Sequence, residues 1–595
     1  MAYFLKKTNR KKGLYLQIYF SYRDPDTKLP KNKCHKTIGF FDDLLKSGIK
    51  NPIEYCQNQV DELNDLYRAE RQNRKIKEIS AVSPERCLGD FPVRSILRRL
   101  DIKDDIDRFS ASRKFQFSVY DCLTDLICAR LIYPASKRKT YEEVIPRLWS
   151  GKEYSYDQIL SCLEFIGNDY EKFVEMFTRH TDETYILDST KTYFDCTNYF
   201  FEIDSEDEWR RKGPSKENRK DPIIGMGLLL DANCIPVSMR LYPGNQSEQP
   251  IMRQALLDLK KQHNLQGRTI TVADKGLNCA RNIYEALKEK DGYIFSKSIK
   301  KLNDKEKTWV LKDEGFIEVL DKDDNVKFKI KSCVDVFPYK WTNENGRVYN
   351  FQVKEKRIVT FNPSLARKQR IEVNKMANKA RACCLYDAKK SEYGESAKFV
   401  DFKSVDESGK ATDQKAVAQV NEEKVKEALS YCGYNMIVTS EINMDEMEIY
   451  HVYHQLWRIE ESFRTLKSEL DARPVYLQTI EKIKGHFLVC YLGVLLERLF
   501  QFKVLENQFG SHQVYEFIRG FKVTPYSNKE HLNISINSDV FQFIQNKYLW
   551  LSVKACGISE GFALVGSGSY PLASGRNTRH LDSHSPFVEP SLSGY

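Results

Sequence analysis

Three acidic residues stand at positions where their carboxylates could converge on metal ions. Asp188 follows the apolar residues 185–187 and Asp274 follows the apolar residues 270–273, so each is predicted to end a strand at the edge of a sheet. Glu460 lies in a stretch that is predicted to be helical. Carboxylate oxygens suit Mg²⁺ or Mn²⁺ rather than zinc. We therefore expect two magnesium ions, replaceable by manganese, and phosphodiester chemistry.

Each of the three positions has a second interpretation, which the sequence leaves open. An aspartate at the end of a strand is often only a turn residue. Glu460 precedes Arg464 by four residues, a spacing that also gives ion pairs on the surface of ordinary helices. It is the combination of all three acids that favours a functional site.

The helix predicted around Glu460 places further side chains beside the carboxylate. At about 100° per residue, Tyr453, Glu460 and Lys467 fall on one face, with Arg464 beside them. A neighbouring apolar stripe is predicted to face the core, which places Glu460 at its margin and turns Glu461 about 100° further, toward solvent. We therefore expect Glu460, and not Glu461, to be the functional acid.

Alternating strands and helices around the two aspartates predict an α/β core. Residues 223–230 and 235–241 are apolar runs separated by a turn, which predicts a hairpin. The core is expected in two parts, residues 183–297 and residues 433–500, with a β-rich insertion at residues 298–432 between them. The helix that carries the glutamate belongs to the second part.

The rest of the chain is predicted to form further modules, because 595 residues are too many for one hydrophobic core. Residues 1–80 are expected to be a β-hairpin followed by a helix, and residues 81–182 an all-helical module. Residues 501–595 should be a C-terminal helical segment with a flexible tail rich in Gly, Ser and Pro. The fold class is therefore multidomain α+β.

Charge and composition limit the partners and the location. Lys and Arg number 93 against 83 Asp and Glu, a net charge of +10, and the basic residues are partly clustered, which favours a polyanionic partner. The 15 cysteines form no Cys-x-x-Cys pair, as is typical of reduced thiols. The most apolar run, residues 487–496, is too short to span a bilayer. We expect a cytoplasmic protein.

The motifs found so far resemble those of the DDE transposases of bacterial insertion sequences, specifically the IS-four-like group. That group shares a Tyr-x2-Arg-x3-Glu-x6-Lys signature around its glutamate. Tyr453, Glu460 and Lys467 match the signature in register, but Leu456 stands where the signature has arginine. The resemblance extends from about residue 184 to residue 496, and it rests on residues 187–194, 213–219, 243–248, 272–276 and the glutamate helix.

Further DNA contacts are predicted by the resemblance. Either Arg458 or Arg464 could replace the missing signature arginine, and we favour Arg464. Lys216 and Arg219 are candidates to contact phosphate, and Trp341 is a candidate to stack on an unpaired base. A solvated charged loop and a tryptophan packed inside a β-domain are the alternatives for these residues.

The resemblance implies an RNase H-like core that performs cut-and-paste DNA transposition. Asp188, Asp274 and Glu460 would be the catalytic and metal-binding triad. The partners would be double-stranded DNA at terminal inverted repeats and target DNA, bound by a homodimer, with the N-terminal modules reading the DNA sequence. The expected location is a bacterial cytoplasm, at the nucleoid. A Mg²⁺-dependent nuclease without strand transfer and a retired transposase kept as a DNA-binding regulator stay open as alternatives.

Overall fold

The computed structural model describes most of the chain up to residue 547. The described residues are 3–24, 29–78, 85–149, 152–217, 219–262, 267–383, 393–405, 411–525, 531–533 and 538–547. Two compact units are present, with residues 1–83 in the first and residues 84–522 in the second. The prediction of a multidomain chain that mixes helices and strands is confirmed. The predicted flexible tail lies outside the described residues.

The first unit contains a three-stranded antiparallel sheet, one strand more than the predicted hairpin. Leu16 and Ile18 alternate along the central strand and are fully buried, and the long helix of this unit contributes buried Cys56 and Val60. This is the pattern of a sheet with one face covered by a helix. The elements are β1 (Tyr3–Arg10), β2 (Gly13–Arg23), β3 (Pro30–Phe40), α1 (Phe41–Lys46) and α2 (Pro52–Glu78).

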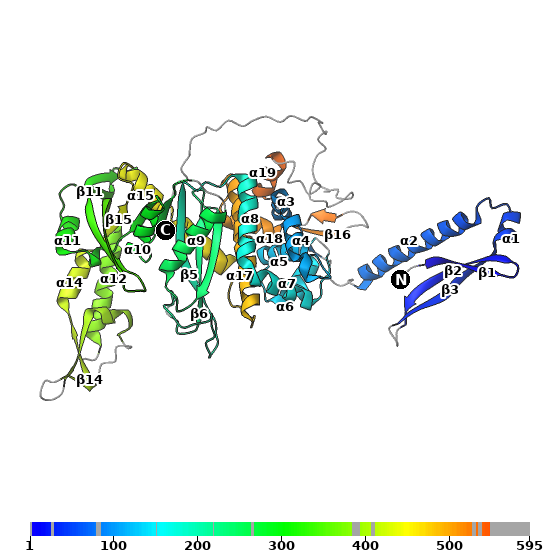
Figure 1. Cartoon of the computed structure of the whole chain (residues 1–595), viewed down its shortest axis with the longest axis horizontal. Helices are drawn as coiled ribbons and strands as arrows, with labels where there is room; N and C mark the ends of the chain where they lie inside the picture. Colours follow the sequence, from blue (N-terminus) through cyan, green and yellow to red (C-terminus); the bar gives the residue numbers. More distant parts are fainter. Residues whose placement is uncertain are drawn as a thin grey trace. The chain divides into compact units, whose positions relative to one another are not determined.

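The helices of the second unit form a bundle around α17 (Ile480–Arg498). Nearly all of α17 is buried, because residues 487–496 are predominantly apolar, and it packs against α5 and α7 (Figure 1). The other helices of this region are α3 (Phe91–Leu100), α4 (Lys103–Ser110), α5 (Val119–Ile132), α6 (Lys137–Lys139), α7 (Tyr156–Asn168), α8 (Tyr170–Tyr185), α18 (Ser511–Gly520) and α19 (Asp539–Lys547). The short strand β4 (Arg86–Cys87) also belongs to this unit, whereas β17 (His531–Asn533) and most of β16 (Lys522–Pro525) are grouped with the first unit.

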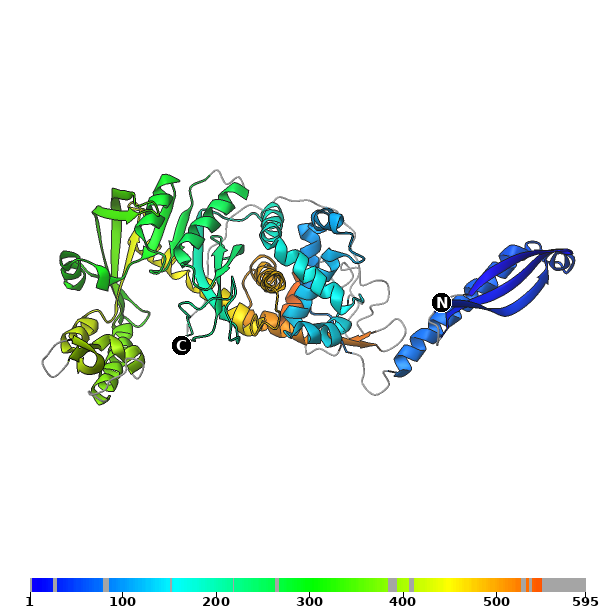
Figure 2. The same cartoon turned by 60° about the horizontal axis from the view of Figure 1, so that its bottom comes forward.

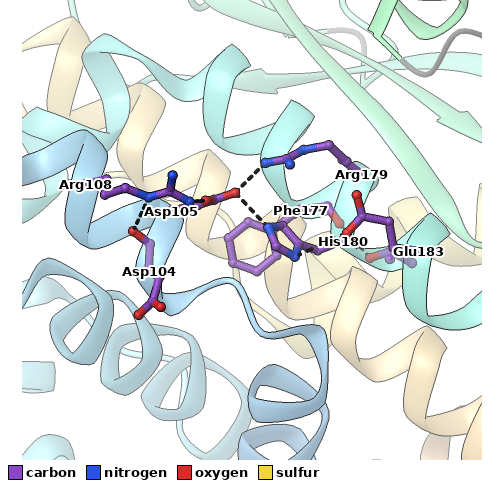
Figure 3. A network of polar contacts seen from close by, with 8 residues as sticks. Asp104, Asp105, Arg108, Phe177, Arg179, His180 and Glu183 are labelled. Atoms are coloured by element: carbon purple, nitrogen blue, oxygen red, sulfur yellow. Dashed lines mark hydrogen bonds and ion pairs between the residues drawn. The ribbon is translucent and has the colours of Figure 1, made fainter.

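A polar network joins α4 to α8 within this bundle (Figure 3). The Asp105 carboxylate on α4 lies 2.9 Å from His180 Nε2 on α8 and forms ion pairs with Arg179 and Arg108. The hydrogen bond with His180, together with the two arginines, lowers the pKa of Asp105 to about 2. The carboxylate is therefore charged over most of the pH range.

A nine-stranded sheet forms the rest of the second unit, in the order β10-β11-β12-β15-β9-β8-β5-β6-β7. β5 pairs with β8, and β8 with β9, in parallel, and all other neighbours are antiparallel. The predicted hairpin of residues 223–230 and 235–241 is present as β6 and β7. The strands are β5 (Lys191–Phe200), β6 (Ile223–Leu230), β7 (Pro236–Pro243), β8 (Ile270–Ala273), β9 (Gly292–Ser296), β10 (Ile317–Leu320), β11 (Val326–Thr342), β12 (Val348–Phe361) and β15 (Tyr434–Thr439).

Helices cover the central strands and bury their side chains. α9 packs against β5, β6 and β7, whereas α10 packs against β9 and β11 and α16 contacts β5. Phe194, Ala273 and Phe295, from three neighbouring strands, share one buried core. The helices are α9 (Glu248–Gln262), α10 (Ala280–Lys288), α11 (Asp304–Leu311), α15 (Glu446–His454) and α16 (Trp457–Arg464). None of the described helices combines the length and the apolar character needed to cross a membrane.

Residues 298–432, predicted as a β-rich insertion, contain the strands β10, β11 and β12, which extend the central sheet through β15. Helices, which the sequence did not predict here, are also present in residues 363–430. The helices arise because residues 363–382 contain many Ala, Lys and Arg and begin with an Asn362 side chain that caps the Leu365 N–H. Figure 2 shows this group, which comprises α12 (Pro363–Ala382), β13 (Val400–Val405), β14 (Ala411–Val420) and α14 (Glu422–Ser430).

The strand predicted at residues 185–187 is absent. α8 continues to Tyr185, and Ile186 then adopts a left-handed φ of 53° with its side chain 79 % exposed. A short apolar run is equally typical of a helix end, and only the packing of α8 decides between the two. The first strand of the central sheet therefore begins later, at Lys191.

Candidate active site

Asp195 and Asp274 are neighbours at one edge of the central sheet. In the parallel pair of β5 and β8, Phe194 lies opposite Ala273. The next residue on each side is an aspartate, Asp195 within β5 and Asp274 directly after β8. Adjacent strands are about 4.8 Å apart, so the two backbones hold these carboxylates close together. Asp195 is partly buried and Asp274 is exposed.

Asp188 lies at the opposite end of β5. It precedes the first residues of the β5 and β8 pair, so about seven residues of strand, on the order of 20 Å, separate its level from that of Asp274. Its carboxylate accepts hydrogen bonds from the N–H and the hydroxyl of Thr190 at 2.9 and 2.6 Å, and its own N–H donates to Asp231 at 3.0 Å. These contacts are those of a turn residue. The structure does not bring Asp188 to the other predicted acids.

Lys216 places its ammonium group between two carboxylates at the edge that carries Asp195. Its Nζ lies 3.6 Å from Asp195 Oδ1 and 3.7 Å from Glu248 Oε1, and it also donates to the Cys196 carbonyl. Burial raises the pKa of Asp195 to about 6, and the negative charges of Glu248 and Asp274 add to this rise. This edge therefore gathers three carboxylates beside one cation.

The loop that carries Lys216 is fixed against β5 and against the turn after β7. Asn198 on β5 donates to the Pro214 carbonyl at 3.1 Å and accepts from the Lys216 N–H at 3.4 Å. Gly213 has no room for a side chain, because a Cβ there would overlap the Gly244 carbonyl. The motif segment before β6 (residues 213–219) and the one after β7 (residues 243–248) therefore meet at this edge.

Tyr453 and Glu460 come from two successive helices rather than from the one predicted helix. α15 ends at His454, and α16 begins at Trp457 after a turn. The Tyr453 hydroxyl donates to Asp274 Oδ1 at 3.3 Å. Burial raises the pKa of Tyr453 above its usual range, and the charges of Asp274 and Glu460 both contribute to the rise. Both carboxylates therefore act on the same hydroxyl group.

Glu461 points into the protein, so the prediction that it faces solvent was wrong. Its carboxylate lies 3.5 Å from Arg458 and 3.4 Å from Arg498, and its side chain is only 12 % exposed. Glu460 is exposed. The reason is that Arg498 on the buried helix α17 provides a partner, which the apolar periodicity around Glu460 does not reveal.

A group of basic side chains lies along the end of β5 beyond Asp195. Glu217 forms ion pairs with Lys467 at 3.2 Å and with Arg473. Although burial favours the neutral form, hydrogen bonds from Arg473 and Lys467 lower the pKa of Glu217. Arg473 and Arg219 lie over the ring of Phe200, at 4.8 and 3.8 Å from its centroid. Lys467 and Arg219 are thus held in place by β5 and its flanking loop.

The three positions near the missing signature arginine differ in their surroundings. Leu456 is buried at the start of α16. Arg458 lies over the ring of Trp457 at 4.0 Å and pairs with Glu461, so its charge is used within the protein. Arg464 is exposed and forms no ion pair with any residue that the structure describes. Arg464 is thus the arginine of α16 that is open to a ligand.

Trp341 packs within a group of aromatic rings on β11 and β12. It stacks on Tyr349 with 4.3 Å between ring centroids and an interplanar angle of 4°, and Tyr284 and Arg281 lie at 5.7 and 5.1 Å. Its indole nitrogen is buried without an acceptor among the described residues. These contacts match the packing alternative that the sequence left open.

The donor chemistry at this edge fits a hard divalent cation. Asp195, Glu248 and Asp274 offer only carboxylate oxygens, and the Lys216 ammonium already provides a positive charge between two of them. Within the described part of the chain, however, no three Asp, Glu, His or Cys side chains converge as a ready-made cage for one ion. The edge therefore has the charge and the ligand type for a metal, with Lys216 among the acids.

Comparison with known proteins identifies the domain that contains this edge. Residues 179–496, just over half of the chain, match the model of a family described as the transposase DDE domain. The chain belongs to the transposase DDE domain family. All the carboxylates at this edge, and the helix that carries Glu460, lie inside this transposase DDE domain.

This transposase DDE domain chain was also compared with solved structures and with curated proteins. A cryo-EM structure of a piggyBac transposase synaptic complex with hairpin DNA is similar at a TM-score of 0.36 and 8 % sequence identity. The similarity covers 72 % of this chain and 77 % of that one. No curated protein matches the sequence.

Sequence reasoning missed Asp195, Glu248 and Arg473. The signal for Asp195 was present, because an acid in the middle of the aromatic run of residues 191–200 is costly to bury unless a partner or a function requires it. Asp188, followed by Ser and Thr, has instead the composition of a turn. Glu248 ends the motif segment of residues 243–248, but nothing in that segment distinguished it from an ordinary acid at the start of a helix.

Proposed function

We propose that this chain is a DNA transposase whose catalytic carboxylates are Asp195, Asp274 and Glu460. The observation that carries the proposal is the register of β5 and β8, which makes Asp195 and Asp274 neighbours. Tyr453 supports the third assignment, because its hydroxyl binds Asp274 and responds to the charge of Glu460. Membership in the transposase DDE domain family supplies the reaction class.

Asp195 takes the place that the sequence suggested for Asp188. Metal-dependent phosphodiester chemistry needs carboxylates that can reach the same ions. Asp188 lies at the other end of its strand and binds Thr190 and Asp231, which supports a structural role. Asp195 lies one residue beyond the strand pair that Asp274 also follows.

The proposed cofactor is a pair of Mg²⁺ ions, with Mn²⁺ as a substitute. Asp195, Asp274 and Glu460 would hold them, and Glu248 is a fourth carboxylate within the same group. Bound divalent ions would activate the attacking water or DNA 3′-hydroxyl and stabilise the leaving oxygen. Tyr453 would orient Asp274 through its hydrogen bond. Lys216 would hold the Asp195 and Glu248 carboxylates in place through its ion pairs until ions and DNA enter.

The basic side chains beyond Asp195 are the proposed contacts to DNA phosphates. Lys467, Arg473 and Arg219 lie in one group, and Arg464 is exposed on the helix of Glu460. Arginine and lysine at such positions would fix the position of the DNA backbone without reading sequence. Trp341 is a weaker candidate, because one of its faces is stacked on Tyr349.

The order of the strands in the central sheet supports an RNase H-like core. The order β7-β6-β5-β8-β9, an antiparallel meander followed by two parallel strands, is what an RNase H-like core requires. We propose this core, membership in the IS-four-like group, and cut-and-paste transposition by a homodimer on terminal inverted repeats. Sequence reading is assigned to residues 1–182, because backbone contacts at the core cannot select DNA ends.

The test is a reaction with purified full-length protein, Mg²⁺ and a labelled duplex that carries the DNA flanking the reading frame. Transposition predicts nicked ends followed by products in which the freed 3′-hydroxyl is joined to a second duplex. Hydrolysis without joined products would favour the nuclease alternative. Specific binding without cleavage under any divalent ion would favour a DNA-binding regulator and contradict the proposal.

A further inference from the structure

A second site lies away from the acidic edge, in a cavity of about 630 Å³ between α6, α17 and the segment after α16. A cavity of this size is in the usual range for small ligands, roughly 300–1,000 Å³. Its lining contains no Asp or Glu. The basic side chains that line it are Arg130, Lys137, Arg138, Lys139 and His486.

Lys137 is the most unusual member of this lining. Its side chain is 6 % exposed, yet it forms no hydrogen bond or ion pair with any residue that the structure describes. Burial lowers the pKa of Lys137 well below its usual range, and the neighbouring charge of Arg130 lowers it further. A buried ammonium without a counter-charge is costly, and an anion in the cavity would remove that cost.

Arg130 and His486 approach the same cavity and are also short of negative partners. Arg130 is 5 % exposed, and among the described residues it donates only to the Leu470 carbonyl, at 3.4 Å. His486 lies 3.0 Å from the Ala472 carbonyl through Nε2, while its Nδ1 is buried with no partner among the described residues. Three buried nitrogen-bearing side chains thus surround a space that contains no carboxylate.

A contrasting cavity shows that this arrangement is particular to the site. A cavity of about 470 Å³ beside α3 and α5 is lined by arginines and lysines as well, but Asp90, Asp101 and Asp121 are part of the same lining. Its Arg94 is paired with two aspartates. In the cavity at Lys137, the less buried Arg138 and Lys139 form ion pairs with Glu142 and Glu143, but Arg130 and Lys137 form none with any residue in the described part of the chain.

We propose that the cavity at Lys137 binds a phosphate group of a DNA strand. Lysine and arginine nitrogens are the usual ligands of phosphate oxygens. The wall formed by residues 474–477 follows directly after Arg473, which pairs with Glu217 at the basic group beside the acidic edge. Tyr476, at the mouth, is 75 % exposed and offers a ring to a neighbouring base. The DNA source rests on the proposed function, whereas the phosphate chemistry does not.

The experiment compares the full-length protein with Lys137→Met, and uses Lys288→Met on the exposed face of α10 as the matched control. One arm measures the rise in melting temperature caused by inorganic phosphate. The other measures binding of a short duplex as a function of salt concentration. We expect phosphate to stabilise the wild type and Lys288→Met but not Lys137→Met, and the duplex affinity to fall about tenfold with a salt slope smaller by about 0.9.

The two arms separate the possible results. Phosphate stabilisation that depends on Lys137, with unchanged duplex binding, would keep the phosphate site but overturn its assignment to DNA. No dependence on Lys137 in either arm would overturn the proposal. If phosphate stabilisation and duplex binding both depend on Lys137 but the wild type performs no strand transfer, only the proposed function would be contradicted.

A measurement on the wild type covers the case in which Lys137→Met does not fold. Lys137 is labelled with a small amine-reactive ester and the extent is read by mass spectrometry. We expect inorganic phosphate and the short duplex each to slow labelling of Lys137 severalfold, with Lys288 unaffected. Equal labelling of Lys137 with and without both ligands would overturn the proposal.

Discussion

Asp195 and Asp274 lie at the same level of two adjacent parallel strands, one residue beyond the paired Phe194 and Ala273. A sheet fixes this relationship through backbone hydrogen bonds, so the spacing of the two carboxylates does not depend on flexible loops. The third acid, Glu460, comes from a helix that contacts β5. The proposed metal-dependent chemistry depends on this arrangement of carboxylates.

Replacement by glutamine should lower stability at Glu461 but remove strand transfer at Glu460. Glu461→Gln leaves the buried Arg498 without its full counter-charge, so we expect a loss of about 3 kcal/mol in unfolding free energy. Glu460→Gln should change stability by less than about 0.5 kcal/mol, because the side chain is exposed. It should nevertheless abolish strand transfer. Denaturant unfolding and a strand-transfer assay measure both effects, and a destabilised but otherwise normal Glu460→Gln would reverse the assignment.

Glu460 and Glu461 also show what the sequence could and could not predict. Periodicity placed Glu460 at the margin of the core-facing stripe and Glu461 toward solvent, whereas Glu460 is exposed and Glu461 pairs with Arg498 on α17, 37 positions further along the chain. The predicted single helix is in fact broken between His454 and Trp457. Such breaks arise from tertiary packing, which local helix propensity does not encode.

Lys216 should compete with divalent ions for the carboxylates of Asp195 and Glu248. In Lys216→Met the ammonium is gone, so we expect Mn²⁺ to bind the protein without DNA about tenfold more tightly, equivalent to about 1.4 kcal/mol. Lys220→Met, an exposed lysine of the same loop, is the control and should bind Mn²⁺ as the wild type does. Titration calorimetry provides the comparison. Weaker Mn²⁺ binding by Lys216→Met would mean that the lysine supports the ion site.

Arg464 should contribute to DNA binding and Arg458 should not. Arg464→Ala removes an exposed charge on the helix of Glu460, so we expect weaker duplex binding and a salt slope smaller by about 0.9. Arg458→Ala removes a partner of Glu461 and should lower the melting temperature instead. Duplex titrations at several salt concentrations distinguish the two. If Arg464→Ala shows the same salt slope as the wild type, Arg464 does not replace the signature arginine whose position is occupied by Leu456.

Asp105 should stabilise the helical bundle in a pH-dependent manner (Figure 3). Its folded pKa of about 2 is below the usual 3.8, so its contribution is fully present above about pH 4 and is lost as the pH falls through 2. We expect Asp105→Asn to cost about 1 to 2 kcal/mol near pH 7 and progressively less below pH 4. Melting curves from pH 7 to pH 2.5 test this, with Asp104→Asn as the neighbouring control. A difference from the wild type that does not shrink at low pH would contradict the role of His180 and the arginines.

The sheet was easier to predict than the identity of its first aspartate. β6, β7 and β8 are where apolar runs predicted strands, because buried strands carry a strong local signal. The choice between Asp188 and Asp195 depends on the register between β5 and β8, whose residues are about 80 positions apart in sequence. A motif match alone gave no information on which end of β5 faces Asp274.

The assignment of Asp195 as a catalytic carboxylate is tested by comparing strand transfer by Asp195→Asn and Asp188→Asn under the same conditions with Mg²⁺. Both replacements remove one carboxylate charge and keep the side-chain shape, and folding is checked by melting temperature. Asp195→Asn should lose strand transfer by about 100-fold or more, because even groups that only support the ligands of a metal can cost that much. Asp188→Asn should keep activity within about tenfold of the wild type. Strand transfer that survives in Asp195→Asn and disappears in a folded Asp188→Asn would contradict the assignment.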